Sequence, residues 1–263
     1  MLASQADLQR VPARRVYERV VTQKHNGQEF LEGVKVKREP MTKVRRLTAE
    51  HMLRSVRVSP HVTTTFEIDL YRVRQAKDSL GAKFSKQYGS KLSYTAFFFY
   101  AAVQGLKKFP VVNASIDGDD ILYKEDINLG CAVAVEEGLV VPVLKGIQDS
   151  SLDAVGLKLN TIVAKARKRQ LTPEDIKGGT FSITNPGMYG SLHSQPINHQ
   201  PQVAILSVGS IVDRPLVWNG DVVVHPSCQV GLTFDHRLID GEIGAKFLAE
   251  VKRVLESAED ILF

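Results

Sequence analysis

The stretch LTFDHRLIDGEIG, residues 232–244, lies where a strand pattern changes into a helix pattern. Residues 229–234 form an apolar run typical of a buried strand, and apolar side chains recur at helical spacing from residue 243 onward. His236 is therefore expected on the turn between the two elements. Ordered turns of this kind often present catalytic groups. A single histidine between charged residues is more often solvated or structurally bonded, so the rest of the chain must decide.

Strand and helix patterns alternate along the rest of the chain, which predicts an α/β fold. Thr48 is expected to cap a short helix, and Ser150, with Asp153 three residues later, is expected to cap a longer one. Strands are predicted at residues 62–68, 180–184 and 203–211, helices at residues 70–84 and 92–108, and hairpins at residues 127–144 and 216–224.

The charge distribution separates the start of the chain from the rest. Residues 1–60 carry 13 Lys and Arg against 6 Asp and Glu, whereas the whole chain has a formal net charge of +5. This basic segment has no interleaved aromatic residues and no nucleic-acid fold signature, so we expect no nucleic-acid binding. No linker divides the chain after about residue 42. We predict a basic N-terminal extension at residues 1–40, with a weak helical pattern at residues 8–21, and one domain at residues 41–263.

The sequence offers no membrane span and no metal motif. No apolar run approaches the roughly 20 residues that a membrane helix needs. Cys131 and Cys228 lie in strand-like runs and are expected to be buried thiols. His193 and His199 match no metal-binding spacing, so no metal is predicted. Without a signal core at the start of the chain, we expect a cytoplasmic protein, or a mitochondrial matrix protein in a eukaryote.

Five blocks of the sequence, in order, resemble the catalytic domain of the dihydrolipoamide acyltransferases, the core subunits of the 2-oxo acid dehydrogenase complexes. A more distant resemblance is to chloramphenicol acetyltransferase. The resemblance covers roughly residues 40–263 and implies a two-layer α/β sandwich with a mixed β-sheet, the fold of the coenzyme A-dependent acyltransferases. The blocks are residues 46–61, GLVVPV at 138–143, GGTFSITNPGMYGS at 178–191, PQVAIL at 201–206 and DHRLIDG at 235–241.

The resemblance implies chemical roles for two residues. His236 matches the general base that takes a proton from a thiol as its sulfur attacks a thioester carbonyl. Thr184 matches the residue whose hydroxyl donates to the resulting oxyanion. Without the resemblance, Thr184 would be read as an ordinary β-branched strand residue. The resemblance also implies trimers with active sites between adjacent subunits, so the two residues are expected to meet across subunits.

Supporting roles follow from the same resemblance. Asp240 matches a residue that orders the turn after the base, either by hydrogen bonding or by pairing with an arginine. Arg45 and Arg46 are the candidates for that pairing. His61 and Ser191 are expected to border the bound substrates, although a surface role for His61 is an equal alternative.

The implied substrates are coenzyme A and a dihydrolipoyl group. No lipoyl or subunit-binding domain is recognisable in residues 1–40, so the lipoyl group is expected on another domain or chain. A homotrimer is implied, which the apolar terminus Ile261-Leu262-Phe263 would join into a larger cage. Dehydrogenase subunits of the complex are the further partners implied.

Two other functions stay open at this stage. The chain could be a core subunit that builds a scaffold without catalysis, or a stand-alone coenzyme A-dependent O-acetyltransferase. Within the acyltransferase hypothesis, the acyl group could be acetyl, succinyl or branched-chain. His199-Gln200 and Pro186-Gly187 replace residues common in the family, which bears on acyl specificity more than on the chemistry.

Overall fold

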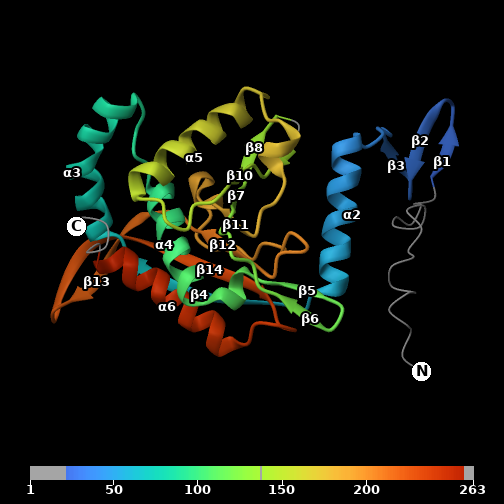
Figure 1. The fold of residues 1–263 in the computed structure, drawn as a ribbon. Helices are drawn as coiled ribbons and strands as arrows, with labels where there is room; N and C mark the ends of the chain where they lie inside the picture. Colours follow the sequence, from blue (N-terminus) through green and yellow to red (C-terminus); the bar gives the residue numbers. More distant parts are fainter. Residues whose placement is uncertain (1–21, 137, 258–263) are drawn as a thin grey trace. The chain divides into compact units, whose positions relative to one another are not determined.

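The computed structural model describes residues 22–136 and 138–257 (Figure 1). Contacts within the chain define two compact units, Met1–Arg54 and Ser55–Phe263, and each is described by itself. The helical pattern at residues 8–21 and the apolar terminus at residues 261–263 lie outside the described residues.

The first unit contains a three-stranded antiparallel sheet. Its two turns are Asn26-Gly27 and Glu32-Gly33, and all four residues have positive φ angles, as tight hairpin turns of this kind require. The sheet lies in the segment predicted as a basic extension, and the boundary after residue 40 stays a prediction. The strands are β1 (Gln23–His25), β2 (Gln28–Leu31) and β3 (Val34–Val36).

Helix α2 (Lys43–Val58) begins before the predicted cap. The hydroxyl of Thr42 accepts a hydrogen bond from the backbone N–H of Arg45, which makes Thr42 the capping residue. The Thr48 hydroxyl instead donates to the carbonyl oxygen of Val44, 3.0 Å away, as a threonine inside a helix can do. The prediction that Thr48 caps this helix is therefore wrong.

The second unit is built on a mixed sheet that has seven strands among the described residues. The strand order is β10-β7-β11-β12-β14-β13, and β4 also pairs with β14. Strand β11 runs parallel to β7 and β12, whereas the other pairs are antiparallel. A mixed sheet with helices confirms the predicted α/β fold class. The strands are β4 (His61–Asp69), β7 (Leu129–Cys131), β10 (Val143–Leu144), β11 (Phe181–Thr184), β12 (Ala204–Val208), β13 (Val212–Trp218) and β14 (Asp221–Asp235).

The predicted hairpin at residues 127–144 is present but interrupted. Proline cannot donate to a ladder, and the carbonyl of Pro142 instead accepts a hydrogen bond from the N–H of Cys131 at 2.8 Å. The N–H of Ala132 crosses to the carbonyl of Ile183 at 3.0 Å. The result is two short pairs instead of one long one: β7 with β10, and β8 (Val133–Val135) with β9 (Gly138–Val140). A separate hairpin pairs β5 (Ser115–Asp117) with β6 (Asp120–Leu122).

Four helices pack with this sheet, and α4 lies among the other three (Figure 1). Phe97, Phe98 and Phe99 of α4 are all fully buried, because successive residues point in different directions around a helix that is covered on every side. Helix α5 is capped by the Ser151 hydroxyl, which accepts from the N–H of Ala154, so the predicted cap at Ser150 is one residue early. The helices are α3 (Tyr71–Tyr88), α4 (Tyr94–Lys108), α5 (Leu152–Arg167) and α6 (Gly241–Ser257).

Two glycines bring α6 close to its neighbours. A Cβ atom on Gly244 would lie 2.7 Å from the ring of Phe234, at the end of β14, and one on Gly105 of α4 would lie 2.8 Å from the ring of Phe247. Both rings are fully buried and have no room to move aside. Helix α6 is therefore fixed against the sheet and against α4, immediately after the turn that carries His236.

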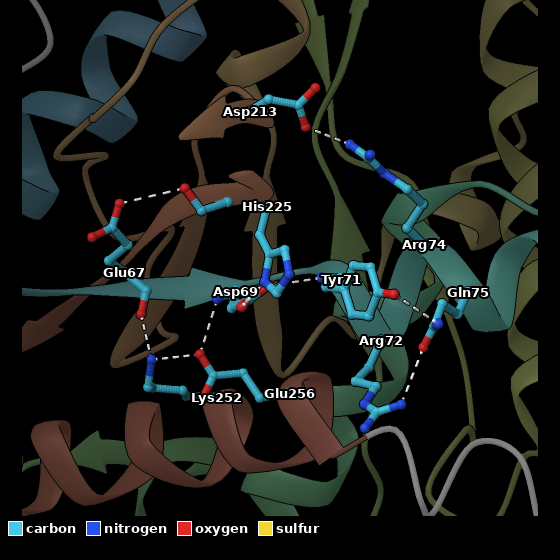
Figure 2. Close-up of polar contacts among 11 residues, drawn as sticks. Glu67, Asp69, Tyr71, Arg72, Arg74, Gln75, Asp213, His225, Lys252 and Glu256 are labelled. Carbon is cyan, nitrogen blue, oxygen red and sulfur yellow. Dashed lines mark hydrogen bonds and ion pairs between the residues drawn. The ribbon is translucent and has the colours of Figure 1, made fainter. Parts of the chain in front are cut away.

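The opposite end of the β4–β14 pair is held by a polar network (Figure 2). The imidazole Nδ1 of His225 lies 2.7 Å from a carboxylate oxygen of Asp69, and the ring stacks on that of Tyr71 with 4.3 Å between centroids. Glu256 of α6 accepts a hydrogen bond from the N–H of Asp69 and another from the Lys252 ammonium. This network joins β4, α3, β14 and α6 at the end of the sheet that is far from His236.

Candidate active site

His236 directly follows β14 and lies on the turn that leads to α6, as the sequence predicts. Its backbone N–H donates to the carbonyl oxygen of Pro60, 2.9 Å away, and its ring centroid lies 5.9 Å from that of the buried Phe234. The residue is exposed, and its imidazole has no hydrogen-bond partner within the described part of the chain. The turn thus holds the backbone of His236 and leaves the side chain free to meet a substrate.

The turn is built around the buried carboxylate of Asp235. The backbone N–H of Arg237 donates to this carboxylate at 3.0 Å, and its guanidinium donates through Nε at 3.0 Å and through a terminal nitrogen at 2.6 Å. Burial opposes ionisation, but the hydrogen bonds from Arg237 together outweigh it and hold the pKa of the Asp235 carboxyl below its usual value. These bonds fix the direction in which His236 leaves the strand.

Asp240 ends the same turn. One carboxylate oxygen accepts a hydrogen bond from the N–H of Ile243 at 2.8 Å, and its carbonyl accepts from the N–H of Gly244. The side chain therefore caps the first turn of α6, and the expectation that Asp240 orders the turn after His236 stays a prediction. The alternative pairing with Arg45 or Arg46, which belong to the first unit, stays a prediction.

Thr184 is the last residue of β11 and is half-buried. Its hydroxyl has no hydrogen-bond partner among the residues that the structure describes, so it is free to donate to an external group. The backbone register pairs Thr184 with Ser207 on β12, and Ser207 with Gly231 on β14. Thr184 therefore lies two strands from β14, level with a residue five positions before His236.

This register keeps Thr184 and His236 of one chain apart. Five residues of strand correspond to roughly 17 Å, and two strand spacings add about 10 Å in the perpendicular direction. Side chains of this size extend only a few ångströms, so the two cannot touch the same carbonyl group. One chain presents the two groups at different places on its sheet.

A loop connects these two places across the face of the sheet. It follows β11, and the carbonyl of Ser191 accepts a hydrogen bond from the N–H of Ser210, near the Thr184 end. Further on, the carbonyl of Ser194 accepts from the Ser207 hydroxyl at 3.1 Å. A Cβ on Gly209 would lie 2.2 Å from a carbonyl oxygen of this loop, so the loop lies directly on the strands. Near its start the loop exposes Met188, Tyr189 and Leu192.

The two residues expected to border the substrates lie at opposite ends of this loop. The hydroxyl of Ser191 donates to the carbonyl of His193 at 2.9 Å, within the loop itself. His61 is the first residue of β4. Its Nε2 accepts a hydrogen bond from the backbone N–H of Asn198, with 3.1 Å between the two nitrogens. Burial lowers the pKa of the His61 imidazole, although the charge of Asp235 acts in the other direction.

Asn198 has a structural role that sequence reasoning missed. This residue is fully buried, its side-chain amide donates to the carbonyl of Val203 at 3.2 Å, and its own carbonyl accepts from the Ser55 hydroxyl at 2.6 Å. An asparagine in a polar stretch is typical of an exposed loop, and its partners Ser55 and His61 are distant in the sequence. The available signal was Val203, an apolar residue at the start of a predicted strand. Its position indicates that the loop becomes buried at its end.

A metal-binding cluster and a membrane-spanning helix are both absent from the described residues. No group of three or more His, Cys, Asp or Glu residues is arranged to hold a metal ion in the described ranges. Within the same ranges, no helix is both long and apolar enough to cross a membrane.

Comparisons with known proteins identify relatives of this chain. Residues 34–263 match the family model of the 2-oxoacid dehydrogenases acyltransferase catalytic domain. The chain is 40% identical over 226 residues to the dihydrolipoyllysine-residue succinyltransferase component of the 2-oxoglutarate dehydrogenase complex of Haemophilus influenzae. That alignment covers 86% of this chain and 55% of the relative, so the chain spans about half the length of the curated relatives it matches.

Solved structures give the same result at the level of the fold. The dihydrolipoamide acetyltransferase of Azotobacter vinelandii, in a structure that addresses the catalytic roles of a serine, a histidine and an asparagine, superimposes with a TM-score of 0.83 at 28% identity. The alignment covers 88% of this chain and 95% of that one. In that enzyme the serine precedes the histidine by 52 residues and the asparagine follows it by four. A chloramphenicol acetyltransferase, 15% identical over 82% of this chain and 99% of its own, shares the fold with a TM-score of 0.50.

Proposed function

This chain belongs to the catalytic-domain family of the 2-oxoacid dehydrogenase acyltransferases, and on that premise we propose that it transfers an acyl group between dihydrolipoyl and coenzyme A thiols. One observation carries the proposal. Thr184 precedes His236 by 52 residues and Asp240 follows it by four, the same spacings as the serine, histidine and asparagine of the Azotobacter enzyme. Positions 184 and 236 therefore hold side chains suited to the same tasks, whereas position 240 holds an acid in place of the amide.

His236 is the proposed general base. A free thiol is mostly protonated at neutral pH, so the neutral imidazole accepts its proton while the sulfur attacks the thioester carbonyl. The tetrahedral oxyanion then collapses, the carbon–sulfur bond to the first thiol breaks, and His236 returns the proton to the leaving sulfur. The exposed imidazole on a rigid turn supports this role, because it can approach two bulky thiols in succession.

Thr184 is the proposed oxyanion donor, acting on the substrate held by the His236 of another copy. The separation within one chain supports this arrangement, and so does the hydroxyl that is left without a partner in the described chain. A donor of this kind is typically worth about 3 kcal/mol in the transition state. Threonine keeps the hydroxyl of the serine at the corresponding position, so the substitution preserves the donor.

Asp240 differs from the asparagine at its position in the Azotobacter enzyme, and we propose a structural role for it. Its carboxylate caps α6, where a negative charge is favoured by the helix dipole. Pairing with Arg45 or Arg46 would add a further restraint on the turn. Ser191 stays a candidate for substrate contact, as does His61, whose hydrogen bonds suggest an additional role.

We extend the proposal to the assembly and its partners. A site made by two copies requires an oligomer, for which we propose a homotrimer that joins a larger cage through Ile261-Leu262-Phe263. The lipoyl group would arrive on another domain or chain, and the dehydrogenase subunits of a 2-oxo acid dehydrogenase complex would be the partners. A place in the cytoplasm, or in the mitochondrial matrix of a eukaryote, fits these partners. Residues 1–40 would be an extension to the catalytic domain at residues 41–263.

The test is an assay with free dihydrolipoamide and acetyl-, succinyl- or isobutyryl-coenzyme A. The wild-type protein should turn over at least one of these, which also identifies the acyl group. His236→Ala should lower turnover by on the order of 10² to 10⁴ without changing the sedimentation of the assembly. Near-normal turnover in this variant would contradict the mechanism. No turnover in the wild type would favour a scaffold, and acylation of a hydroxyl acceptor alone would favour an O-acetyltransferase.

A further inference from the structure

His61 belongs to a closed ring of contacts beside His236. The N–H of Asn198 donates to Nε2 of His61, and the Asn198 amide donates to the carbonyl of Val203. The same carbonyl accepts the N–H of Asp235 at 2.8 Å, and Asp235 is the cross-strand partner of His61. The ring thus joins the end of the loop, the start of β4 and the end of β14. His236 is the residue that follows it.

This closed ring of hydrogen bonds requires the His61 imidazole to be neutral. A neutral imidazole that accepts at Nε2 carries its hydrogen on Nδ1. In the charged form both nitrogens carry hydrogen. Nε2 would then point a donor at the N–H of Asn198, and the hydrogen bond between them would be lost. Protonation of His61 is therefore incompatible with the ring.

Burial favours the neutral form of the His61 imidazole and so lowers its pKa. Asp235 is the charged group on the neighbouring strand, and it would favour the charged imidazole. The Asp235 carboxylate accepts hydrogen bonds from the guanidinium and the N–H of Arg237. These bonds weaken its attraction for a charged His61 imidazole. The hydrogen-bond partners on the loop side are uncharged: the Asn198 N–H donates to the imidazole, and the Asn198 carbonyl accepts from the Ser55 hydroxyl.

We propose that His61 is a positioning residue for His236: the neutral imidazole holds Asn198 and, through Val203, the end of β14, and protonation of His61 releases this hold. The inference rests on the proposed function only where it concerns catalysis. The release of the loop is a property of the folded chain and can be measured without any substrate.

Two variants separate the hydrogen bond from the charge. His61→Gln keeps a side-chain acceptor for the Asn198 N–H but cannot titrate, whereas His61→Leu removes the acceptor. His25→Gln, which changes an exposed histidine on β1, is the matched control. Sedimentation of each variant establishes that the assembly is intact.

The first readout is hydrogen exchange of the peptide that contains residues 198–203, corrected for the intrinsic effect of pH. His61→Leu should lose about tenfold in protection at pH 7. The wild type and His25→Gln should lose protection as the pH falls below the ordinary range of a histidine, while His61→Gln should not. Unchanged protection in His61→Leu, or the same pH response in His61→Gln as in the wild type, would overturn the proposal.

The second readout is acyl transfer. His61→Leu should lower kcat about tenfold with both KM values within about twofold of the wild type, and His61→Gln should restore most of kcat. In the dependence of kcat on pH, the acid side should show one ionising group fewer for His61→Gln than for the wild type. A raised KM at unchanged kcat would instead assign His61 to substrate binding. If the wild type transfers no acyl group, the proposed function fails, whereas the exchange experiment still decides the role of His61.

Discussion

Arg237 and Asp235 lie two residues apart, and the backbone N–H and the guanidinium of Arg237 both donate to the buried Asp235 carboxylate. The two partners differ in exposure, since Asp235 is 1% exposed and the Arg237 side chain is 42% exposed. Arg237→Gln would leave a buried carboxylate without its ion-pair partner. It should lower the free energy of unfolding by about 3 kcal/mol. Asp235→Asn leaves a cation that water can reach and should cost about 1 kcal/mol. Denaturant unfolding at one fixed protein concentration measures both.

The same pair gives a pH dependence of known sign. The pKa of Asp235 is lowered in the folded protein, so its contribution to stability is present above the unfolded pKa near 3.9 and is lost as the pH falls through the folded value. Asp235→Asn should therefore flatten the acid side of the stability profile. Equal costs for the two variants, with no change in the acid profile, would show that the pair does not stabilise the turn.

Two inactive variants should restore activity when they assemble together. His236→Ala and Thr184→Ala each destroy one half of the proposed site, but a mixed oligomer contains interfaces with both halves intact. Random mixing in equal amounts should give about one quarter of the wild-type acyl transfer, because each half is intact with a probability of one half. The assay follows co-refolding of the two variants. Activity no greater than that of each variant alone would place both residues in the same chain's site.

The glycines of α6 and α3 form a matched pair for a packing prediction. Gly244→Ala places a Cβ against the buried Phe234 ring and should cost about 2 kcal/mol. It should also lower kcat, because the strained ring lies beside His236. Gly81→Ala in α3 meets no atom within 4 Å and should stabilise by about 0.5 to 1 kcal/mol through helix propensity. Unfolding midpoints compare the two, and a neutral Gly244→Ala would contradict the packing argument.

Much of the fold could be predicted because its signals are local. The change from strand to helix around His236 and the hairpin at residues 216–224 each depend on a short window of sequence, and both are confirmed. The identity of each capping residue was harder to predict, because several polar residues lie near the first turn of each helix. Thr42 and Ser151 are the caps that the structure selects.

The contacts around the proposed site could not be predicted from local sequence patterns. The hydrogen bond between His61 and Asn198 joins residues 137 positions apart, and the bond between Ser55 and Asn198 joins residues 143 apart. No periodicity in the sequence encodes such a contact, because it depends on how the strands are ordered in the sheet. For the same reason the distance between Thr184 and His236 within one chain required the strand register.

Lys124 provides a last prediction, because it is partly buried against uncharged groups. Its ammonium donates to the Ser115 hydroxyl at 2.5 Å and to the carbonyl of Asn113 at 3.2 Å, and burial lowers its pKa to about 8. Between pH 8 and the unfolded value near 10.4, the unfolded chain binds more protons than the folded one. The free energy of unfolding should therefore rise with pH through this range. We expect a gain of about 1 kcal/mol, since solvent screens part of the effect.

Other groups titrate in the same range, so the prediction concerns the difference between two proteins. Lys124→Met removes the buried charge, and the rise in its unfolding free energy from pH 7 to pH 9.5 should be smaller than that of the wild type. Lys83→Met changes an exposed lysine on α3 and should follow the wild-type curve. The Ser115 hydroxyl also donates to the carbonyl of Pro201, in the loop that ends at Val203, so Lys124 stabilises this loop through Ser115. A wild-type slope in Lys124→Met would mean that water, not the protein, solvates the ammonium.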